Sequence, residues 1–430
     1  MTSRKEFLEN IAAIGGFGAL GGCRILADPE VGFSYRGWCE GEMDLHFVYT
    51  GCGENTFFQL PDGTTILCDT GDYYRPQESF LVPKLPSPDL LGGEWMLRYM
   101  RYACGELSPY GEKIVDYAVF THWHSDHIGH SEFRGFDDRE SGYRFRKTRD
   151  GRMINGFLSV AEHFGFRRYL DHQYPARDDY RTADSSLGLL APWVDDQRKK
   201  GLEVEAFRPG ALDQIALLRN PKKYAADFHI RNICANGVLW DAHSGVRDYA
   251  AEHVRVTGKE KISQNLLSLG LVIEYGKFRF FTGGDVSGSL MGNDGRMVDY
   301  EGLVGASVGH VNVCKMNHHG CDNAMGDGFV GAVRAQTYVA AMWCPWQACP
   351  EVLARLTRFG AYDGSNSLLL LNSVGKFQKD GERDGGYELP PLGQYHVVIK
   401  VFPGGERYRA YLLDPRDEDR RVVAVFDRVA

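Results

Sequence analysis

The stretch THWHSDHIGH, residues 121–130, places four histidines and one aspartate within ten positions, although the chain of 430 residues contains only 14 histidines. In extended backbone, residues two apart face the same way, so His122 and His124 can present two imidazoles to one metal ion. The chain then has to turn, and Asp126 with His127 can reach a second ion. Imidazole and carboxylate ligands suit zinc, iron or manganese. This stretch therefore predicts a metal site.

Two further groups of metal-binding side chains also end apolar runs. Asp285 ends the run FTGGD, where the glycines allow backbone and metal to approach closely, so its carboxylate can bridge two ions. His318 and His319 end the run before HHG, and the pattern leaves open which of them is the ligand. We expect two divalent ions, with zinc as the first choice and manganese or iron as alternatives. The predicted ligands are His122, His124, Asp126, His127, Asp285 and His318, and the predicted catalytic groups are Asp126 and His319.

The segments that carry these residues have the patterns of strands. The apolar run 114–124 predicts a buried strand that delivers the histidine cluster at its C-terminal end, where α/β proteins place their chemistry. Further strands are predicted at 45–49, 55–60, 64–69, 167–172, 229–240, 309–320 and 333–343, hairpins at 266–285 and 395–414, and helices at 94–104 and 157–166.

Composition indicates one large globular unit. The chain is 43% hydrophobic, and no internal repeat or linker is evident, so we expect a single α/β domain over residues 40–415. Within it, 131–260 is expected to be a charged insertion that shapes the cleft, and 416–430 a C-terminal tail. The net charge of −8 includes no basic run that would mark a nucleic-acid-binding tail. A nucleic-acid substrate stays open, because metal ions can supply the positive charge.

The first 23 residues are typical of an export signal, with a basic start, a short apolar region and small residues before Cys23. The start resembles the twin-arginine pattern with Lys5 in place of the second arginine, and the residues before Cys23 resemble a bacterial lipoprotein cleavage site. The apolar run is too short to span a membrane. These features predict a bacterial envelope or periplasmic location, with Cys23 as a lipid anchor and a cytoplasmic location as the alternative.

The cysteines favour unpaired thiols. The chain has ten cysteines and no Cys-x-x-Cys pair, and nine remain if Cys23 is lipidated, which is an odd number. Cys68, Cys234 and Cys314 lie in apolar runs, where a free cysteine behaves as a small hydrophobe.

The ligand pattern resembles the metallo-β-lactamase superfamily. The signature His-x-His-x-Asp-His stands at 122–127, and the later aspartate and last histidine of that superfamily match Asp285 and either His318 or His319. Within it, the chain most resembles the metallo-hydrolase domain of the bacterial DNA-uptake channel protein, the ComEC competence protein, and its stand-alone relatives. TGCGENTFF, CDTGD, YGKFRFFTGGD and HHGC carry this resemblance, over residues 43–130 and 262–375. It implies an α/β fold of the αββα type, in which two mixed β-sheets are flanked by helices, with long insertions.

The chain also departs from the family pattern. The family commonly has glycine at His130 and serine at Cys321. The third histidine motif has no clear match before Asp285, and Asp171 and His172 are the nearest candidates to replace it. Weaker candidates are His229, His243 and His253.

The resemblance implies a hydrolase that attacks its substrate with metal-activated water. Asp126 would orient that water, and whichever of His318 and His319 is not a ligand would donate a proton. Asp69 and Asp72 are expected to hold ligand imidazoles by hydrogen bonds. The side chains that could line a substrate pocket are Trp123, Trp240, Trp343 and Trp346.

The expected substrate is a small-molecule or nucleic-acid ester. A phosphodiester is the first choice, and a lactone, a thioester or a β-lactam is the alternative. An iron-based oxidoreductase is the runner-up chemistry, although the di-iron members usually have glutamate at the position of His124. A non-catalytic metal-binding envelope lipoprotein is the alternative from another class. We expect no protein partner.

Overall fold

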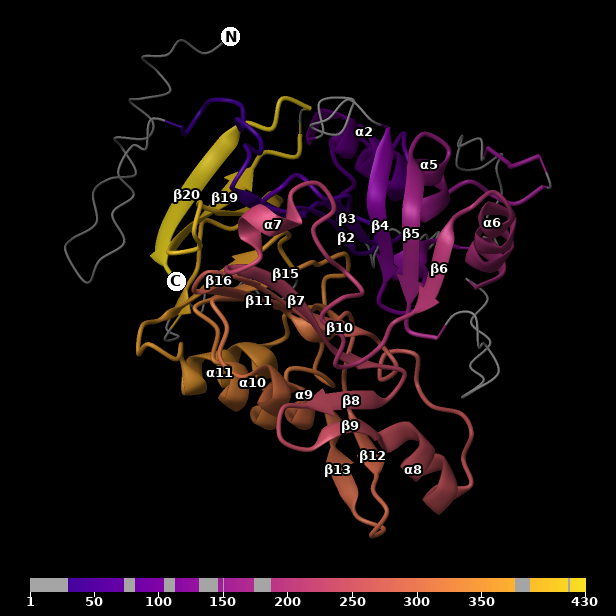
Figure 1. Ribbon diagram of the computed structural model, residues 1–430. Helices are drawn as coiled ribbons and strands as arrows, with labels where there is room; N and C mark the ends of the chain where they lie inside the picture. The colour runs from indigo at the N-terminus through magenta and orange to yellow at the C-terminus, as the bar shows by residue number, and fades with distance from the viewer. Residues whose placement is uncertain are drawn as a thin grey trace.

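The computed structural model describes residues 30–72, 82–103, 113–130, 146–149, 151–173, 187–375, 387–416 and 418–430. These residues form four layers in the order helix, sheet, sheet, helix (Figure 1). This is the predicted αββα sandwich, in which two mixed β-sheets are flanked by helices. The expected export signal 1–23, with Cys23, lies outside the described residues.

The first sheet has nine strands within the described residues, in the order β20-β19-β18-β1-β2-β3-β4-β5-β6. Neighbouring strands pair antiparallel from β20 to β3 and parallel from β3 to β6. The strands are β1 Met43–Phe47, β2 Asn55–Gln59, β3 Thr65–Thr70, β4 Ile114–Phe120, β5 Gly165–Asp171, β6 Glu203–Ala206, β18 His396–Val401, β19 Arg407–Leu413 and β20 Val422–Val429.

The second sheet also has nine strands among the residues that are described, in the order β17-β16-β15-β14-β11-β10-β7-β8-β9. Its strands are β7 Phe228–Ala235, β8 Val238–Asp241, β9 Gly245–Asp248, β10 Gly270–Tyr275, β11 Phe278–Thr282, β14 Val313–Lys315, β15 Thr337–Ala340, β16 Ser367–Leu371 and β17 Tyr387–Glu388. A small separate hairpin consists of β12 Ser289–Met291 and β13 Met297–Asp299. The hairpin predicted at 266–285 is confirmed, because β10 and β11 pair antiparallel.

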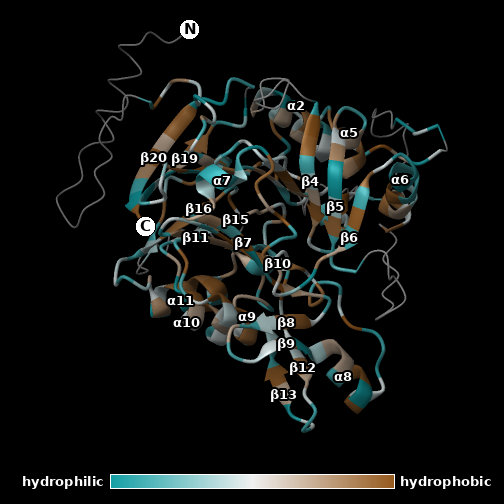
Figure 2. Cartoon of the chain, viewed as in Figure 1, coloured by the Kyte–Doolittle hydropathy of each residue, from teal (hydrophilic) through white to brown (hydrophobic). Residues whose placement is uncertain are grey.

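Helices cover the outer face of each sheet (Figure 1). Helices α2 Gly92–Ala103, α5 Phe157–Ala161 and α6 Leu187–Lys199 pack on the first sheet, and α9 Tyr300–Val308, α10 Asp327–Val333 and α11 Pro350–Phe359 pack on the second. Figure 2 shows hydrophobic and hydrophilic residues alternating along α6 and α8, as expected for helices with one exposed face. The remaining short helices are α3 Ser125–Ile128, α7 Pro221–Tyr224, α8 Tyr249–Thr257 and the 3-10 turn η2 Asn317–Gly320. No helix within the described ranges is both long and apolar enough to cross a membrane.

The core between the sheets follows from the alternation of strand residues. On β4, Tyr117 and Val119 belong to the core between the sheets, whereas Phe120 belongs to the core under the helices. Across the sheets, the ring of Phe280 on β11 lies 5.6 Å from the ring of Phe58 on β2, centroid to centroid. Aromatic contacts of this kind fix how the two sheets face each other.

Two regions that the sequence sets apart belong to the sandwich. Residues 416–430, expected as a tail, contain β20, which pairs with β19 at the edge of the first sheet. The region 131–260, expected as an insertion, supplies β5 and β6 to the first sheet and β7, β8 and β9 to the second. Leu170 and Ile230 from this region are buried in the core between the sheets.

Strands from both sheets bring the candidate ligands together. Strand β4 ends two residues before His122, and β11 ends three residues before Asp285. Strand β14 runs parallel to β11, so the residues that follow these two strands lie at the same edge of the second sheet. His318 and His319 follow β14 in this way.

The buried His46 on β1 predicts acid sensitivity. Burial lowers the pKa of His46 to about 4, whereas a histidine in an unfolded chain has a pKa of about 6.5. The unfolded state therefore binds more protons between these values, and the free energy of unfolding falls as the pH drops from about 6.5 to about 4. We expect His46 to contribute up to about 3 kcal/mol of that loss, measured by urea unfolding at several pH values. A His46→Gln variant should show a shallower pH dependence, and an unchanged slope would contradict this expectation.

Candidate metal centre

The first cluster lies where the chain leaves β4. His124 has an extended backbone, with φ −69° and ψ 152°, and helix α3 begins directly after it. The short helix turns Asp126 and His127 towards the interior, where both are buried. Gly71 makes this turn possible, because a Cβ on Gly71 would lie only 1.7 Å from the carbonyl oxygen of Asp126.

A buried carboxylate orients His127. Asp69 Oδ2 accepts a hydrogen bond from His127 Nδ1 at 2.8 Å, and Asp69 also accepts from the backbone N and the hydroxyl of Thr121 at 2.8 and 2.6 Å. With Nδ1 engaged, Nε2 of His127 is the nitrogen that faces the centre. His127 Nε2 is fully buried and has no hydrogen-bond partner among the described residues.

Gly284, directly before Asp285, allows the halves of the sandwich to approach closely. Gly284 has a φ of +55°, and a Cβ there would lie 2.5 Å from Thr121 Cβ of the first cluster. The backbone N of Asp285 donates to Ser268 Oγ at 3.2 Å. The carboxylate of Asp285 is thereby held against the histidines that come from the other sheet.

His318 and His319 are adjacent but differ in their surroundings. Both have left-handed backbone, with φ 46° and 55°. His319 is buried, and its Nδ1 donates to the carbonyl oxygen of Ala341 at 2.8 Å, so its Nε2 faces the centre. The His318 side chain is 22% exposed and lies between Asn323 Oδ1 at 2.6 Å and Asn265 Nδ2 at 3.1 Å.

Helix α9 holds the turn that carries these two histidines. Glu301 accepts hydrogen bonds from Asn317 Nδ2 at 2.9 Å, from the backbone N of Met325 at 2.7 Å and from the backbone N of Gly326 at 3.0 Å. Burial raises the pKa of Glu301 to about 7, although these three donors favour the charged form. Glu301 therefore ties both ends of the loop around His319 to one helix.

Carboxylate oxygens of Asp126 and Asp285 lie close to the Nε2 atoms of His127 and His319. Asp285 Oδ2 is 3.2 Å from His127 Nε2 and 3.5 Å from His319 Nε2, and Asp126 Oδ2 is 3.8 and 3.3 Å from the same two nitrogens. Donors about 2.0–2.2 Å from a tetrahedral ion lie about 3.3–3.6 Å from one another. The donor atoms of His127, Asp285 and His319 lie within 4.8 Å of one another, and with the carboxylate of Asp126 beside both histidines they form a four-donor set that could hold a zinc-sized ion.

The other two histidines of the first cluster form a second donor set beside this one. His122 Nε2 lies 3.0 Å from His124 Nδ1 and 3.8 Å from Asp285 Oδ2. The same carboxylate oxygen of Asp285 thus faces both donor sets. This arrangement has room for the bridging role that the sequence predicts for Asp285.

The electrostatics match a cation-binding site. Burial opposes the charged form of His127 and His319, but Asp285 and Asp126 outweigh burial, so the pKa of His127 rises well above its usual range and that of His319 rises to about 9. Burial and the neighbouring histidines His127 and His124 hold the pKa of His122 well below its usual range. Burial also opposes the charged form of Asp285, yet the surrounding histidines lower its pKa well below the usual range. The centre therefore keeps its carboxylates ionised.

Sequence reasoning missed two charged residues at this centre, Glu54 and Lys315. Glu54 stands within 4.8 Å of the donors of His127, Asp285 and His319, and these four residues together could hold a metal ion. Its Oε2 is nevertheless only 2.5 Å from Lys315 Nζ, so the ammonium of Lys315 already pairs with that carboxylate. The available signal was a lysine inside the apolar run that contains β14, where a charged residue is rare unless it is paired.

The candidates for the missing third histidine, Asp171 and His172, both contact Trp123. Asp171 accepts hydrogen bonds from Trp123 Nε1 at 3.2 Å and Tyr169 OH at 2.7 Å. The ring of His172 lies 4.3 Å from the ring of Trp123, and its Nε2 is 3.0 Å from Gln264 Oε1. Neither residue belongs to the four-donor set. Both hold the tryptophan that separates His122 from His124.

The weaker histidine candidates have contacts elsewhere. His229 pairs with Glu274, and Nδ1 of His253 accepts from the backbone N of Met291. The backbone N of His243 donates to Asp241. The backbone N of His130 donates to Asn155 Oδ1.

Asp72 does not hold an imidazole, contrary to expectation. Its oxygens accept hydrogen bonds from the backbone N of Gly92, Gly93 and Gly156, at 3.3, 3.2 and 3.2 Å. Gly92 and Gly93 begin α2, whose first N–H groups have no partner within the helix. Asp72 therefore fixes the start of α2 next to the cluster.

One of the four tryptophans contacts a candidate ligand through its ring nitrogen. Trp343 Nε1 lies 3.4 Å from His319 Nε2, and Trp346 in the same loop is 41% exposed. Trp123 is buried, and Trp240 packs under the guanidinium of Arg231. Trp343 is thus the tryptophan best placed to line a substrate site.

Seven of the described cysteines are free thiols, as expected, namely Cys39, Cys52, Cys68, Cys234, Cys314, Cys321 and Cys349. Cys68, Cys234 and Cys314 are fully buried in the cores.

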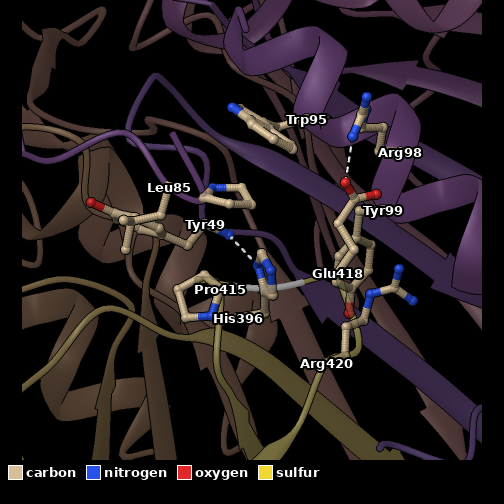
Figure 3. Close-up of a pocket in the computed structure, with 10 residues that line it drawn as sticks. Tyr49, Leu85, Trp95, Arg98, Tyr99, His396, Pro415, Glu418 and Arg420 are labelled. Atoms are coloured by element: carbon tan, nitrogen blue, oxygen red, sulfur yellow. Dashed lines mark hydrogen bonds and ion pairs between the residues drawn. The ribbon is translucent and has the colours of Figure 1, made fainter. Parts of the chain in front are cut away.

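A separate small pocket lies where α2 meets the C-terminal segment (Figure 3). In it, the backbone N of Tyr49 donates to His396 Nδ1 at 3.0 Å, and Arg98 pairs with Glu418. None of the predicted ligands lines this pocket. It adds no residue to the candidate metal centre.

Comparisons with known proteins give little beyond this geometry. No protein-family model and no curated protein matches the chain. The chain is similar to the crystal structure of Zn²⁺-bound PqqB from Methylobacterium extorquens, with 12% identity over 80% of this chain and 86% of that chain and a TM-score of 0.35. It is also similar to the crystal structure of the short form of human tRNase Z, with 10% identity over 83% of this chain and 98% of that chain and a TM-score of 0.31.

Replacing Asp69 by asparagine should weaken metal binding. The variant removes the carboxylate that orients His127, and such partners of ligands are typically worth about 10- to 100-fold in metal affinity. The dissociation constant for Zn²⁺, measured by competition with a chelating dye, tests this. Asp116→Asn is the matched control, because Asp116 is also a buried carboxylate. Its partners are Thr65, Arg167 and Arg219, and none of these three is a candidate ligand. Equal affinities of wild type and Asp69→Asn would contradict the expectation.

Replacing Gly71 by alanine should displace Asp126. The added methyl group cannot occupy a position 1.7 Å from Asp126 O, so the backbone of α3 has to move. We expect Gly71→Ala to lose bound metal, measured by elemental analysis of purified protein. Gly165→Ala is the control, because a Cβ there meets nothing closer than 3.7 Å. Full metal content in Gly71→Ala would show that the close contact is not required.

Proposed function

We propose that the chain is a metal-dependent hydrolase of the metallo-β-lactamase type that cleaves a phosphodiester or a related ester. The observation that carries the proposal is the four-donor set Asp126, His127, Asp285 and His319, whose donor atoms lie close to one another in a buried place. The order of these residues in the sequence resembles that of the superfamily. Surface clusters of histidine do not usually combine burial, orienting partners and convergence from two sheets.

The proposed ligands are shared between two donor sets. Asp126, His127 and His319 belong to one set, His122 and His124 to the other, and Asp285 faces both. Bound divalent ions would supply a hydroxide nucleophile at neutral pH and a Lewis acid for the substrate oxygen. The chemistry of the donors suits zinc, with manganese or iron as alternatives.

His319 is the proposed ligand of the adjacent pair, and His318 the proposed proton donor, which reverses the assignment made from sequence. The bond from His319 Nδ1 to a backbone carbonyl leaves Nε2 as a lone-pair donor towards Asp126 and Asp285. His318 is partly exposed, and Asn323 and Asn265 hold its two ring nitrogens. A group that exchanges protons with substrate has to be reachable, and His318 meets that requirement.

Asp126 keeps its proposed role as the group that orients the attacking water. Burial opposes its ionisation, but His127 and His319 hold its pKa well below the usual range. It is also slightly exposed, with an 11% exposed side chain, so it can reach both donors and solvent. Trp343, which contacts His319, is the proposed wall of the substrate site.

Turnover of model substrates tests the proposal. Wild-type protein loaded with Zn²⁺ or Mn²⁺ should hydrolyse bis-p-nitrophenyl phosphate, and Asp126→Ala should reduce kcat by about 100-fold or more, because it removes a ligand and the water-orienting group. His318→Asn should lower kcat while metal content stays constant. Nitrocefin, a lactone and a thioester, assayed in parallel, rank the alternative ester classes.

The controls separate the hydrolase from a binding protein. His229→Asn alters a histidine outside the centre and should keep full activity. Stoichiometric metal without turnover of any of these esters would contradict the hydrolase and favour a non-catalytic metal-binding protein.

A further inference from the structure

We propose that Lys315 and Glu54 form a positioning pair for Asp285. The ammonium of Lys315 attracts one carboxylate oxygen of Asp285 across 3.7 Å, while the other oxygen faces the histidines, and Glu54 neutralises the charge of Lys315. The inference rests on the proposed function, because it assumes that Asp285 and the donors around it bind a metal ion.

The two carboxylate oxygens of Asp285 face different groups. Lys315 Nζ lies 2.5 Å from Glu54 Oε2 and 3.7 Å from Asp285 Oδ1, and it donates to the carbonyl oxygen of Gly284 at 2.7 Å. Asp285 Oδ1 has no hydrogen-bond donor among the described residues, so the ammonium is the positive charge that faces it. The other oxygen, Oδ2, faces His127 and His319.

The pair also joins the two halves of the sandwich under the centre. Lys315 ends β14 of the second sheet, and Glu54 immediately precedes β2 of the first. The backbone N of Glu54 donates to Asp126 O at 2.7 Å, and the backbone O of Glu54 accepts from Gly71 N at 2.8 Å. One residue of the pair is thus bound to the turn that carries Asp126, and the other lies beside Asp285.

The charges explain why the pair needs both members. Both side chains are almost completely buried, with exposed fractions of 0% for Lys315 and 1% for Glu54. An uncompensated ammonium there would repel a divalent cation and compete with it for the carboxylate of Asp285. Glu54 offsets that charge, so Lys315 can orient Asp285 without weakening the site. Burial opposes the charged lysine, but Glu54 and Asp285 raise the pKa of Lys315, and the ammonium stays protonated.

The metal affinity of two variants tests the proposal. Glu54→Gln keeps the shape of the side chain and leaves the ammonium uncompensated, so we expect the Zn²⁺ dissociation constant to rise by about 10- to 100-fold. The double variant Lys315→Met/Glu54→Gln removes both charges with similar volume. We expect it to bind Zn²⁺ more tightly than Glu54→Gln and more weakly than wild type, because the repulsion is gone but Asp285 is no longer held. A merely structural role predicts that the double variant is no better than the single one.

Glu42→Gln is the matched control. Glu42 lies 2.8 Å from the buried ammonium of Lys400 in the first sheet, and neither residue contacts a candidate ligand. This variant should bind Zn²⁺ as wild type does. If Glu54→Gln does not fold, the double variant alone tests the proposal. A Zn²⁺ affinity of the double variant equal to that of wild type would then overturn it.

The possible failures can be told apart. A wild-type protein that binds no Zn²⁺ overturns the proposed function. A wild type that binds Zn²⁺, with Glu54→Gln of equal affinity or with no recovery in the double variant, overturns only the role of the pair.

Discussion

The carboxylate of Asp285 is the group on which the candidate metal centre depends. A buried carboxylate costs several kcal/mol in lost hydration unless opposite charges or hydrogen bonds surround it. Asp285 Oδ2 lies within 3.8 Å of His122, His127, His318 and His319, and Oδ1 lies 3.7 Å from Lys315. Histidines from the turns after β4 and β14, together with the lysine that ends β14, therefore converge on one side chain. A bound cation would complete this compensation, which links the stability of the centre to its proposed chemistry.

The αββα sandwich explains how such a convergence arises. The parallel strands β11 and β14 end at a common edge of the second sheet, and the turns after them carry Asp285 and the last histidine pair. The turn after β4 of the first sheet carries the first cluster. Glycines at the points of closest approach, Gly71 and Gly284, let the turns meet without side-chain clashes. The carboxylates outside the donor group, Asp69 and Glu301, fix the turns themselves. The ligands are consequently positioned by strands and buried hydrogen bonds.

Local pattern was sufficient to predict much of this architecture. The buried run before His122 and the hairpin that ends in Asp285 are continuous segments whose periodicity is visible in the sequence, and both are strands in the structure. The donor residues were also visible, because spacing within 122–127 is a local property.

What the sequence could not supply is contact between distant segments. Glu54 and Lys315 are 261 positions apart in number, and only folding brings them within 2.5 Å. The difference between His318 and His319 depends on Ala341 and Asn265, which are remote from the motif. Strand β20 was expected as a tail although it pairs with β19, the strand directly before it in the chain, so this miss concerns a local pattern.

Anomalous X-ray diffraction at the zinc absorption edge, from crystals of the Zn²⁺-loaded protein, tests the central claim most directly. The expected result is a peak within coordination distance of Asp126, His127, Asp285 and His319, with a second peak beside His122 and His124 at higher Zn²⁺ concentration. A protein that crystallises with excess Zn²⁺ and shows no anomalous peak between these side chains, or a peak only at surface residues, would contradict the assignment of a metal centre.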